Sequence, residues 1–165
     1  MTPSPEELIR VALIGVGATA TMDLWLLLLR RAGVPQLDFA LIGRWAGHAA
    51  RGRWRHEAIA RAEPVPRERA LGWLVHYAVG IGFAGLLVAL HGAAWLREPR
   101  LLPALCTGVA TVLAPWLLMQ PAMGAGIAAS RTAAPMRNRL RSLANHAVFG
   151  VGLYLAGWCI AALVP

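Results

Sequence analysis

The sequence predicts an all-α membrane protein with four transmembrane helices. Hydrophobic residues fill 58% of its 165 positions, whereas soluble domains are roughly 45–50% apolar. They form four separate blocks, each near the ~20 residues that cross a ~30 Å hydrocarbon core. Because backbone polar groups in lipid must be paired within their own segment, these blocks form helices. Four blocks of this length leave no polar face, which argues against a soluble helical bundle.

We expect one integral-membrane domain over residues 1–165. Its spans are predicted at about residues 8–30, 70–91, 101–121 and 142–164, with a long cytoplasmic connection at about residues 31–69. The segment before the first span is acidic rather than basic, so we do not expect a cleavable signal peptide. Within the first span, Asp23 lies about two turns from the cytoplasmic end. Its short side chain does not easily reach the interface.

The cytoplasmic connection is too long to be a simple turn. Residues 38–50 fit an amphipathic helix with Phe39, Ile42 and Trp45 on one side, and such a helix lies in the membrane interface. A dense basic cluster follows at residues 51–56. We therefore expect an amphipathic and strongly basic segment at the cytoplasmic face.

The second and fourth spans share a histidine pattern. Both read His-x-x-x-Gly-x-Gly before a large apolar residue, starting at His76 and at His146. The first and third spans share a weaker pattern, a glycine eight residues before a tryptophan. These likenesses indicate a 2+2 tandem repeat; chance similarity between glycine-rich segments is the alternative. In the third span, Pro115 is internal and should kink the helix.

The distribution of arginine predicts the orientation. The net charge of +8 arises from 16 arginines and no lysine, with nine arginines between Arg30 and Arg69 and four between Arg131 and Arg141. These two connections share one side of a four-span protein. The positive-inside rule places that side in the cytoplasm and both termini outside. Anionic headgroups at the inner face account for this charge, so we expect no nucleic-acid partner.

Four polar residues are predicted at one depth in the membrane. At ~1.5 Å per helical residue, Asp23, His76 and His146 each lie roughly 8–10 Å inside the arginines at the cytoplasmic ends of their spans. Gln120 lies near the same end of the third span. Ionisable groups inside a membrane usually face the bundle interior and find partners. We therefore predict an intramembrane polar site formed by Asp23, His76, Gln120 and His146.

A set of short motifs resembles a known family. They are Met22-Asp23-Leu24-Trp25, Gly43-Arg44-Trp45 with Gly47-His48, Arg51-Gly52-Arg53, Gly72-Trp73-x-x-His76-Tyr77, Gln120-Pro121-Ala122-Met123-Gly124 and the stretch from Arg141 to Tyr154. Together they resemble the bacterial integral-membrane family called domain of unknown function 2938, over nearly the whole chain. The resemblance implies a small multi-pass protein of the bacterial inner membrane, and it supplies no reaction.

The first hypothesis for the polar site is a cofactor. Asp23, His76 and His146 would hold a transition metal, since a carboxylate beside two imidazoles suits zinc or iron. Haem with two histidine ligands is a variant of this hypothesis. No span offers a paired His-x-x-x-His, which weakens the metal hypothesis.

The second hypothesis is a membrane enzyme that acts on a phosphorylated lipid by acid–base chemistry. Arginine side chains would hold the phosphate headgroup through bidentate hydrogen bonds. The candidates are Arg44, Arg53, Arg131 and Arg141.

In the third hypothesis, the polar residues are structural or line a path for a small solute or lipid. The Asp23 carboxylate would accept hydrogen bonds from both imidazoles and lock the bundle. Four short helices make a narrow bundle, so transport would call for a homodimer. Membrane lipids, with anionic headgroups at the cytoplasmic face, are the partners expected in every case.

Overall fold

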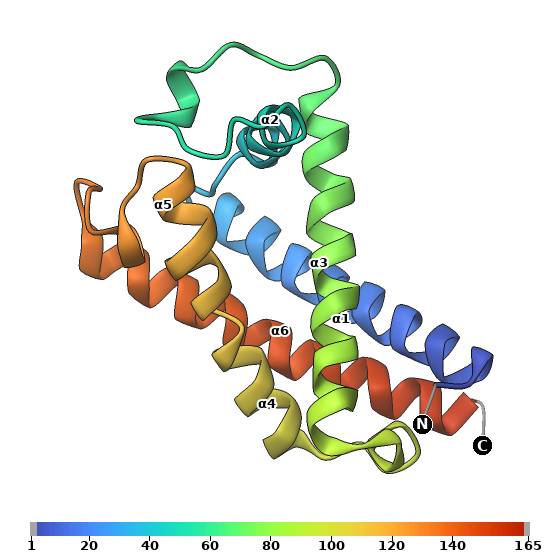
Figure 1. Cartoon of the computed structure of the whole chain (residues 1–165). Coiled ribbons are helices and arrows are strands. Elements are labelled where there is room, and N and C mark those ends of the chain that lie inside the picture. Colours follow the sequence, from blue (N-terminus) through green and yellow to red (C-terminus); the bar gives the residue numbers. More distant parts are fainter. Residues whose placement is uncertain (1–2, 164–165) are drawn as a thin grey trace. The chain divides into compact units, whose positions relative to one another are not determined.

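The computed structural model describes residues 3–163, and the secondary structure over this range is helical, without strands. Four helices in the described range are long and apolar enough to cross a membrane: Pro5–Arg31, Glu68–His91, Leu101–Ala122 and Pro135–Leu163. They are drawn in Figure 1. The prediction of an all-α membrane protein with four spans is confirmed. The fourth helix begins earlier than predicted, because its basic first turns are also helical. The last residue of its predicted span, Val164, lies outside the described residues.

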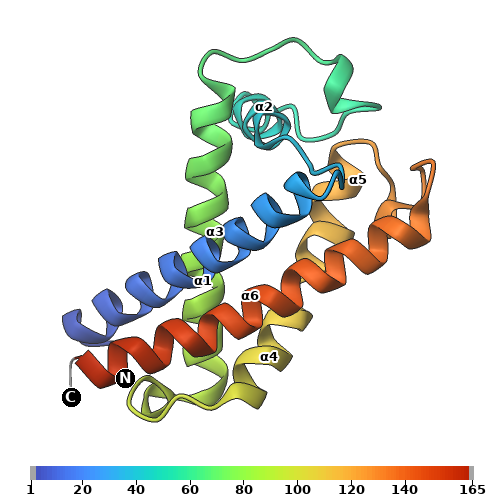
Figure 2. The ribbon, with the colours of Figure 1, turned by 180° about the vertical axis from the view of Figure 1, so that it is seen from behind.

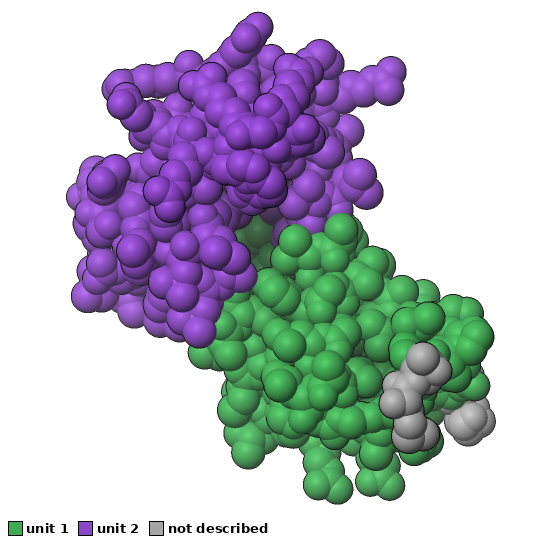
Figure 3. All heavy atoms as spheres, viewed as in Figure 1, with its two compact units in different colours: residues 1–34, 77–111, 144–165 green, residues 35–76, 112–143 purple. Residues whose placement is uncertain are grey.

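The chain divides into two compact units, which Figure 3 colours separately. Unit 1 comprises Met1–Val34, Tyr77–Thr111 and Ala144–Pro165, and unit 2 comprises Pro35–His76 and Val112–Leu143. Helices α3 (Glu68–His91) and α6 (Pro135–Leu163) contribute residues to both units. That the two units form a single domain stays a prediction.

Helix α1 (Pro5–Arg31) begins at a capping box. The Ser4 hydroxyl accepts a hydrogen bond from the Glu7 amide at 3.2 Å, and the Glu7 carboxylate accepts one from the Ser4 amide at 2.9 Å. These bonds satisfy amide groups that have no partner within the helix. Arg30 and Arg31 lie in the last turn, where positive charge complements the helix dipole.

In unit 1, α1 packs antiparallel to α3 and α6 through small residues. A Cβ added to Gly15 would collide with the backbone of Ile81 in α3, and one added to Gly152 of α6 would meet Ala18. Helices α1 and α6 lie side by side in both Figure 1 and Figure 2. Small residues allow this approach, as is usual in membrane bundles. The surrounding core contains Ile14, Leu87, Trp95, Leu96, Phe149 and Leu153.

The glycines of the repeated pattern make corresponding contacts. Gly80 follows His76 by four residues, and a Cβ there would meet the Thr19 hydroxyl of α1. Gly150 follows His146 by four residues, and a Cβ there would meet the backbone of Leu105 in α4 (Leu101–Ala110). In each pair of spans, the same glycine of the pattern lets two helices approach closely. This correspondence supports the 2+2 tandem repeat.

The third span is interrupted within its length. Helix α4 ends at Ala110, a π-helical segment η3 runs over Pro115–Met119, and a short α5 covers Gln120–Ala122. A proline ring clashes with the carbonyl four residues earlier, which here belongs to Thr111. The predicted disturbance by Pro115 is therefore present, and it takes the form of a break one turn before the proline.

In unit 2, helix α2 (Phe39–Ala49) crosses the first turns of α3. The Asp38 carboxylate caps α2 by accepting a hydrogen bond from the Ala40 amide at 2.9 Å. A Cβ on Gly43 would collide with the Glu68 carbonyl, and a Cβ on Gly72 would collide with the Phe39 carbonyl. Glycine is therefore required where the two helices meet. The helix predicted at residues 38–50 is confirmed.

Unit 2 also joins the two basic connections of the chain. The His56 amide donates to the Ala122 carbonyl at 2.8 Å, and the Ile59 amide donates to the Met123 carbonyl at 3.0 Å. Gly124 has φ of +95°, and a Cβ there would collide with the carbonyl of residue 57. The short helices η1 (Ile59–Arg61) and η4 (Ile127–Ala129) flank this junction. The first and third connections therefore form one structure.

Candidate functional site

Asp23 lies on the face of α1 that meets α3. Its carboxylate Oδ2 accepts a hydrogen bond of 2.9 Å from the Tyr77 hydroxyl, and both side chains are half-buried in unit 1. A carboxylate among apolar helices needs a donor of this kind, because lipid offers none. The sequence predicted Asp23 as a site residue but not Tyr77, although Tyr77 directly follows the predicted site residue His76.

His146 lies on the face of α6 that meets the end of α4. Its Nδ1 atom is 2.8 Å from the Thr111 hydroxyl, which itself donates to the Gly108 carbonyl. A hydroxyl has one proton to donate, so the imidazole carries its proton on Nδ1 and donates to Thr111.

A third polar contact joins α1 to α6. The Trp25 indole donates to the Asn145 side-chain oxygen at 3.0 Å. Unit 1 thus contains a polar layer, by which we mean Asp23, Trp25, Tyr77, Thr111, Asn145 and His146. Four of these residues were not part of the predicted site. The signal that could have found Tyr77 and Asn145 is their position beside the two histidines.

The other two predicted site residues belong to unit 2. The His76 ring packs against Phe39, with ring centroids 4.5 Å apart, and against Trp73 at 5.8 Å. The Gln120 side-chain oxygen is buried without a hydrogen-bond partner among residues 3–163, as is the Trp116 indole nitrogen. The convergence of Asp23, His76, Gln120 and His146 at one site stays a prediction.

The described part of the chain contains no group of three or more histidine, cysteine, aspartate or glutamate side chains that could hold a metal ion. A phenol hydroxyl donates to Asp23, and His146 is hydrogen-bonded to a threonine hydroxyl. In unit 1 these contacts serve as hydrogen bonds between helices.

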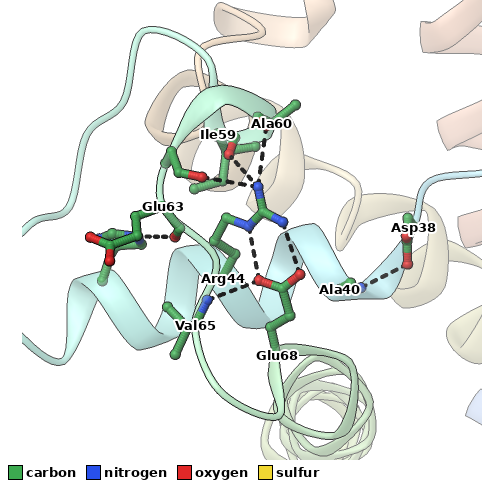
Figure 4. A network of polar contacts seen from close by, with 10 residues as sticks. Asp38, Ala40, Arg44, Ile59, Ala60, Glu63, Val65 and Glu68 are labelled. Atoms are coloured by element: carbon green, nitrogen blue, oxygen red, sulfur yellow. Dashed lines mark hydrogen bonds and ion pairs between the residues drawn. The ribbon is translucent and has the colours of Figure 1, made fainter.

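Arg44 of unit 2 lies at the centre of a network of polar contacts, which Figure 4 shows. Its guanidinium donates two parallel hydrogen bonds of 2.9 Å to the Glu68 carboxylate. It also donates to the carbonyls of Ala60 at 3.2 Å and Ala62 at 3.1 Å. The hydrogen bonds to Glu68 raise the pKa of Arg44 above its ordinary value. This side chain holds η1 and α2 together, and its binding of a headgroup stays a prediction.

The other three arginines predicted to bind anions also belong to unit 2. Arg53 and Arg131 are exposed, and Arg141 is half-buried. Their unit contains eleven arginines and four acidic residues, a net charge of +7. Nearly all of the net charge of the chain therefore belongs to unit 2.

The exposed arginines of unit 2 come from both basic connections. They are Arg51, Arg53, Arg55, Arg61, Arg67, Arg69, Arg131 and Arg137. Because backbone hydrogen bonds join the two connections, these side chains share one folded support. Chemically, such a surface can bind phosphate groups through several guanidinium contacts at once.

Comparison with known proteins gives a family and no activity. A family model described as "Protein of unknown function (DUF2938)" matches residues 12–160 of the chain. No curated protein and no solved structure matches the chain.

Proposed function

The chain belongs to the DUF2938 family, and we propose that it is a bacterial inner-membrane protein that binds the phosphate headgroups of anionic lipids at the cytoplasmic face. The observation that carries this proposal is the charge of unit 2, which has eleven arginines against four acidic residues. Unit 1 has five arginines against four acidic residues. The excess of positive charge is thus confined to the part of the chain that contains both basic connections.

Electrostatics favour a lipid surface as the partner of these arginines. A basic residue close to an anionic membrane surface contributes about 1 kcal/mol of binding free energy. A guanidinium can also form two parallel hydrogen bonds with one phosphate. Several exposed arginines on one support would therefore hold anionic lipids more tightly than neutral ones. The proposal does not depend on Arg44, because Glu68 and backbone carbonyls accept hydrogen bonds from its guanidinium.

The orientation follows from the same charge. The positive-inside rule favours unit 2 on the cytoplasmic side, with both termini of the four-span chain outside. The inner leaflet is also the leaflet whose surface carries anionic lipids. The proposed orientation and the proposed lipid binding thus both depend on the positive charge of unit 2.

We infer a structural role for the polar layer of unit 1. Its contacts join α1 to α3, α1 to α6, and the end of α4 to α6. Interhelical hydrogen bonds in membranes contribute only about 0.6 kcal/mol each on average. Three of them, added to the glycine contacts, fix the register of the helices rather than supply most of the stability.

Lipid retention tests the proposal. The purified chain is placed in nanodiscs of mixed phosphatidylcholine and phosphatidylglycerol, and native mass spectrometry counts the lipids of each class that stay bound. We expect preferential retention of phosphatidylglycerol. In the triple variant R51Q/R53Q/R55Q, the preference should fall by at least about tenfold, since each lost charge removes about 1 kcal/mol.

The matched control is R97Q/R100Q, which removes two arginines of unit 1 from the short connection predicted outside. This control should leave the lipid preference unchanged. Equal retention of the two lipids by the unmodified chain, or an unchanged preference in the triple variant, contradicts the proposal.

A further inference from the structure

In the described part of the chain, His56 in unit 2 has two buried polar atoms without a hydrogen-bond partner, whereas Trp116 and Gln120 have one each. His56 is 8% exposed, and neither of its ring nitrogens has a hydrogen-bond partner among residues 3–163. Buried polar groups are nearly always hydrogen-bonded, so an exception of this kind calls for an explanation. The residue lies at the junction of the two basic connections, where its own amide donates to the Ala122 carbonyl at 2.8 Å.

The groups around the imidazole do not favour a positive charge. The His48 ring of α2 packs edge-on against it, with centroids 5.0 Å apart, while His48 Nε2 donates to the Glu63 carbonyl at 2.9 Å. From its own segment, Arg53 acts on it as a cation. The opposing residues 112–123 contain no titratable side chain. The neighbouring Glu57 is exposed.

Burial lowers the pKa of His56 below its ordinary value, the charge of Arg53 and the proximity of His48 lower it further, and the Ala122 carbonyl raises it by a smaller amount. An undocked segment would titrate near the ordinary pKa of ~6.5. Between the lowered pKa and ~6.5, the undocked segment therefore binds more protons than the docked one. The stability of docking is complete above ~6.5 and is lost as the pH falls through this window.

We propose that His56 is an acid-sensitive latch that holds the segment of residues 51–59 against the turn at residues 122–124. When the ring is protonated, the imidazolium is buried and is repelled by Arg53, and the nearby Ala122 carbonyl compensates these costs only in part. The segment then detaches, and the backbone hydrogen bonds of His56 and Ile59 to the turn break.

Release would change the charge that the segment presents. The freed segment carries Arg51, Arg53, Arg55 and one added cation on His56. Positive charge on a mobile segment is attracted to an anionic surface. Acid should therefore strengthen the retention of anionic lipids, a consequence that rests on the proposed function.

Hydrogen exchange measured by mass spectrometry tests the latch without any lipid. The full chain in a neutral detergent is compared at about pH 7.5 and about pH 5, on either side of the ordinary histidine pKa, after correction for intrinsic exchange rates. We expect the peptide covering residues 55–60 to exchange several-fold faster at the lower pH. Peptides of α1 should show no such change.

The variant His56→Phe retains a ring of similar size and cannot be protonated. Its segment should stay protected at both pH values, whereas the control His91→Phe, in unit 1, should respond like the unmodified chain. Equal protection of the unmodified chain at both pH values overturns the latch, and so does release of the phenylalanine variant at the lower pH.

A second measurement does not depend on the variant folding. Exchange of the imidazole Cε1 hydrogen in the unmodified chain reports the pKa of His56 directly. A value below ~6.5 is expected, and a value at or above it overturns the latch. Lipid counting in nanodiscs at the two pH values then tests the coupling. Segment release without stronger retention of phosphatidylglycerol overturns the coupling alone, while loss of preference at both pH values overturns the proposed function instead.

Discussion

The Tyr77 hydroxyl on α3 donates a hydrogen bond of 2.9 Å to the Asp23 carboxylate on α1. The bond joins two antiparallel helices that are long and apolar enough to cross a membrane, and hydrocarbon supplies no donor. An ionisable residue inside a span is costly and persists where a partner compensates it. The hydrogen bond offsets the free-energy cost of burying Asp23, and it fixes how α1 and α3 align.

Removal of the donor should therefore destabilise unit 1. For Tyr77→Phe we expect a loss of about 1–2 kcal/mol in the free energy of unfolding. This range includes the upper end of measured interhelical hydrogen bonds, which average about 0.6 kcal/mol and reach about 1.7. The loss above the average arises because the half-buried Asp23 carboxylate loses the Tyr77 donor. Unfolding by sodium dodecyl sulfate in mixed micelles, followed by circular dichroism, measures the difference.

Tyr154→Phe is the matched control, since Tyr154 is a half-buried tyrosine of α6 packed against the same core. It should change the unfolding free energy by less than about 0.5 kcal/mol, as substitutions away from specific contacts do. Equal stability of the Tyr77→Phe chain and the unmodified chain would show that Asp23 does not depend on this bond.

Substitution by alanine at two nearby glycines of α3 should have different effects on stability. At Gly80, a Cβ would collide with the Thr19 hydroxyl. Thr19 is fully buried and donates to the Gly15 carbonyl at 2.8 Å, so it has no room to move. We expect Gly80→Ala to cost about 1–3 kcal/mol, the usual effect of an overpacked core.

Gly82 supplies the internal comparison on the same helix. Nothing lies within 4 Å of a Cβ placed there, and the residue is exposed. Gly82→Ala should be neutral or should stabilise the helix by up to about 1 kcal/mol, since alanine favours helix more than glycine does. Thermal unfolding of both variants in one detergent measures the contrast. Similar losses in the two variants would contradict the close packing at Gly80.

The sequence predicted the helices of this fold more completely than it predicted their contacts. The four spans follow from apolar block length, and the break in the third follows from Pro115. Asp23 and His146 were identified because ionisable groups are rare in lipid. Tyr77 and Thr111 were missed because their roles depend on the register between helices, which no periodicity within one helix reveals.

Unit 2 was the least predictable part, for a physical reason. The bonds from His56 to Ala122 and from Ile59 to Met123 join backbone atoms, and backbone atoms leave no pattern in the sequence. Arg44 was predicted to bind a headgroup from its charge alone. Its pairing with Glu68 depends on the crossing of α2 over α3. In the sequence, the glycines at residues 43 and 72 are the features that correspond to this crossing.

Arg44→Lys should loosen unit 2 although it keeps the charge. Lysine has no planar fork, so it cannot reproduce two parallel bonds to Glu68 together with the contacts to the carbonyls of η1. We expect faster amide exchange in the peptide covering residues 59–63 and a loss of about 1–3 kcal/mol in stability, the usual effect for hydrogen bonds to a charged group. Arg137→Lys, at an exposed site, should leave both unchanged. Unaltered exchange in the Arg44→Lys chain would show that the pair does not hold η1.

The orientation of the chain can be tested with single cysteines. The native Cys106 and Cys159 are replaced by alanine, and cysteine is introduced at Arg55 in unit 2 or at Arg97 in unit 1, both exposed positions. Because positive charge is retained on the cytoplasmic side, a membrane-impermeant maleimide should label Arg97→Cys in intact spheroplasts. It should label Arg55→Cys only after permeabilisation. The reverse pattern would place the basic unit outside and would remove the electrostatic basis for its binding to inner-leaflet lipids.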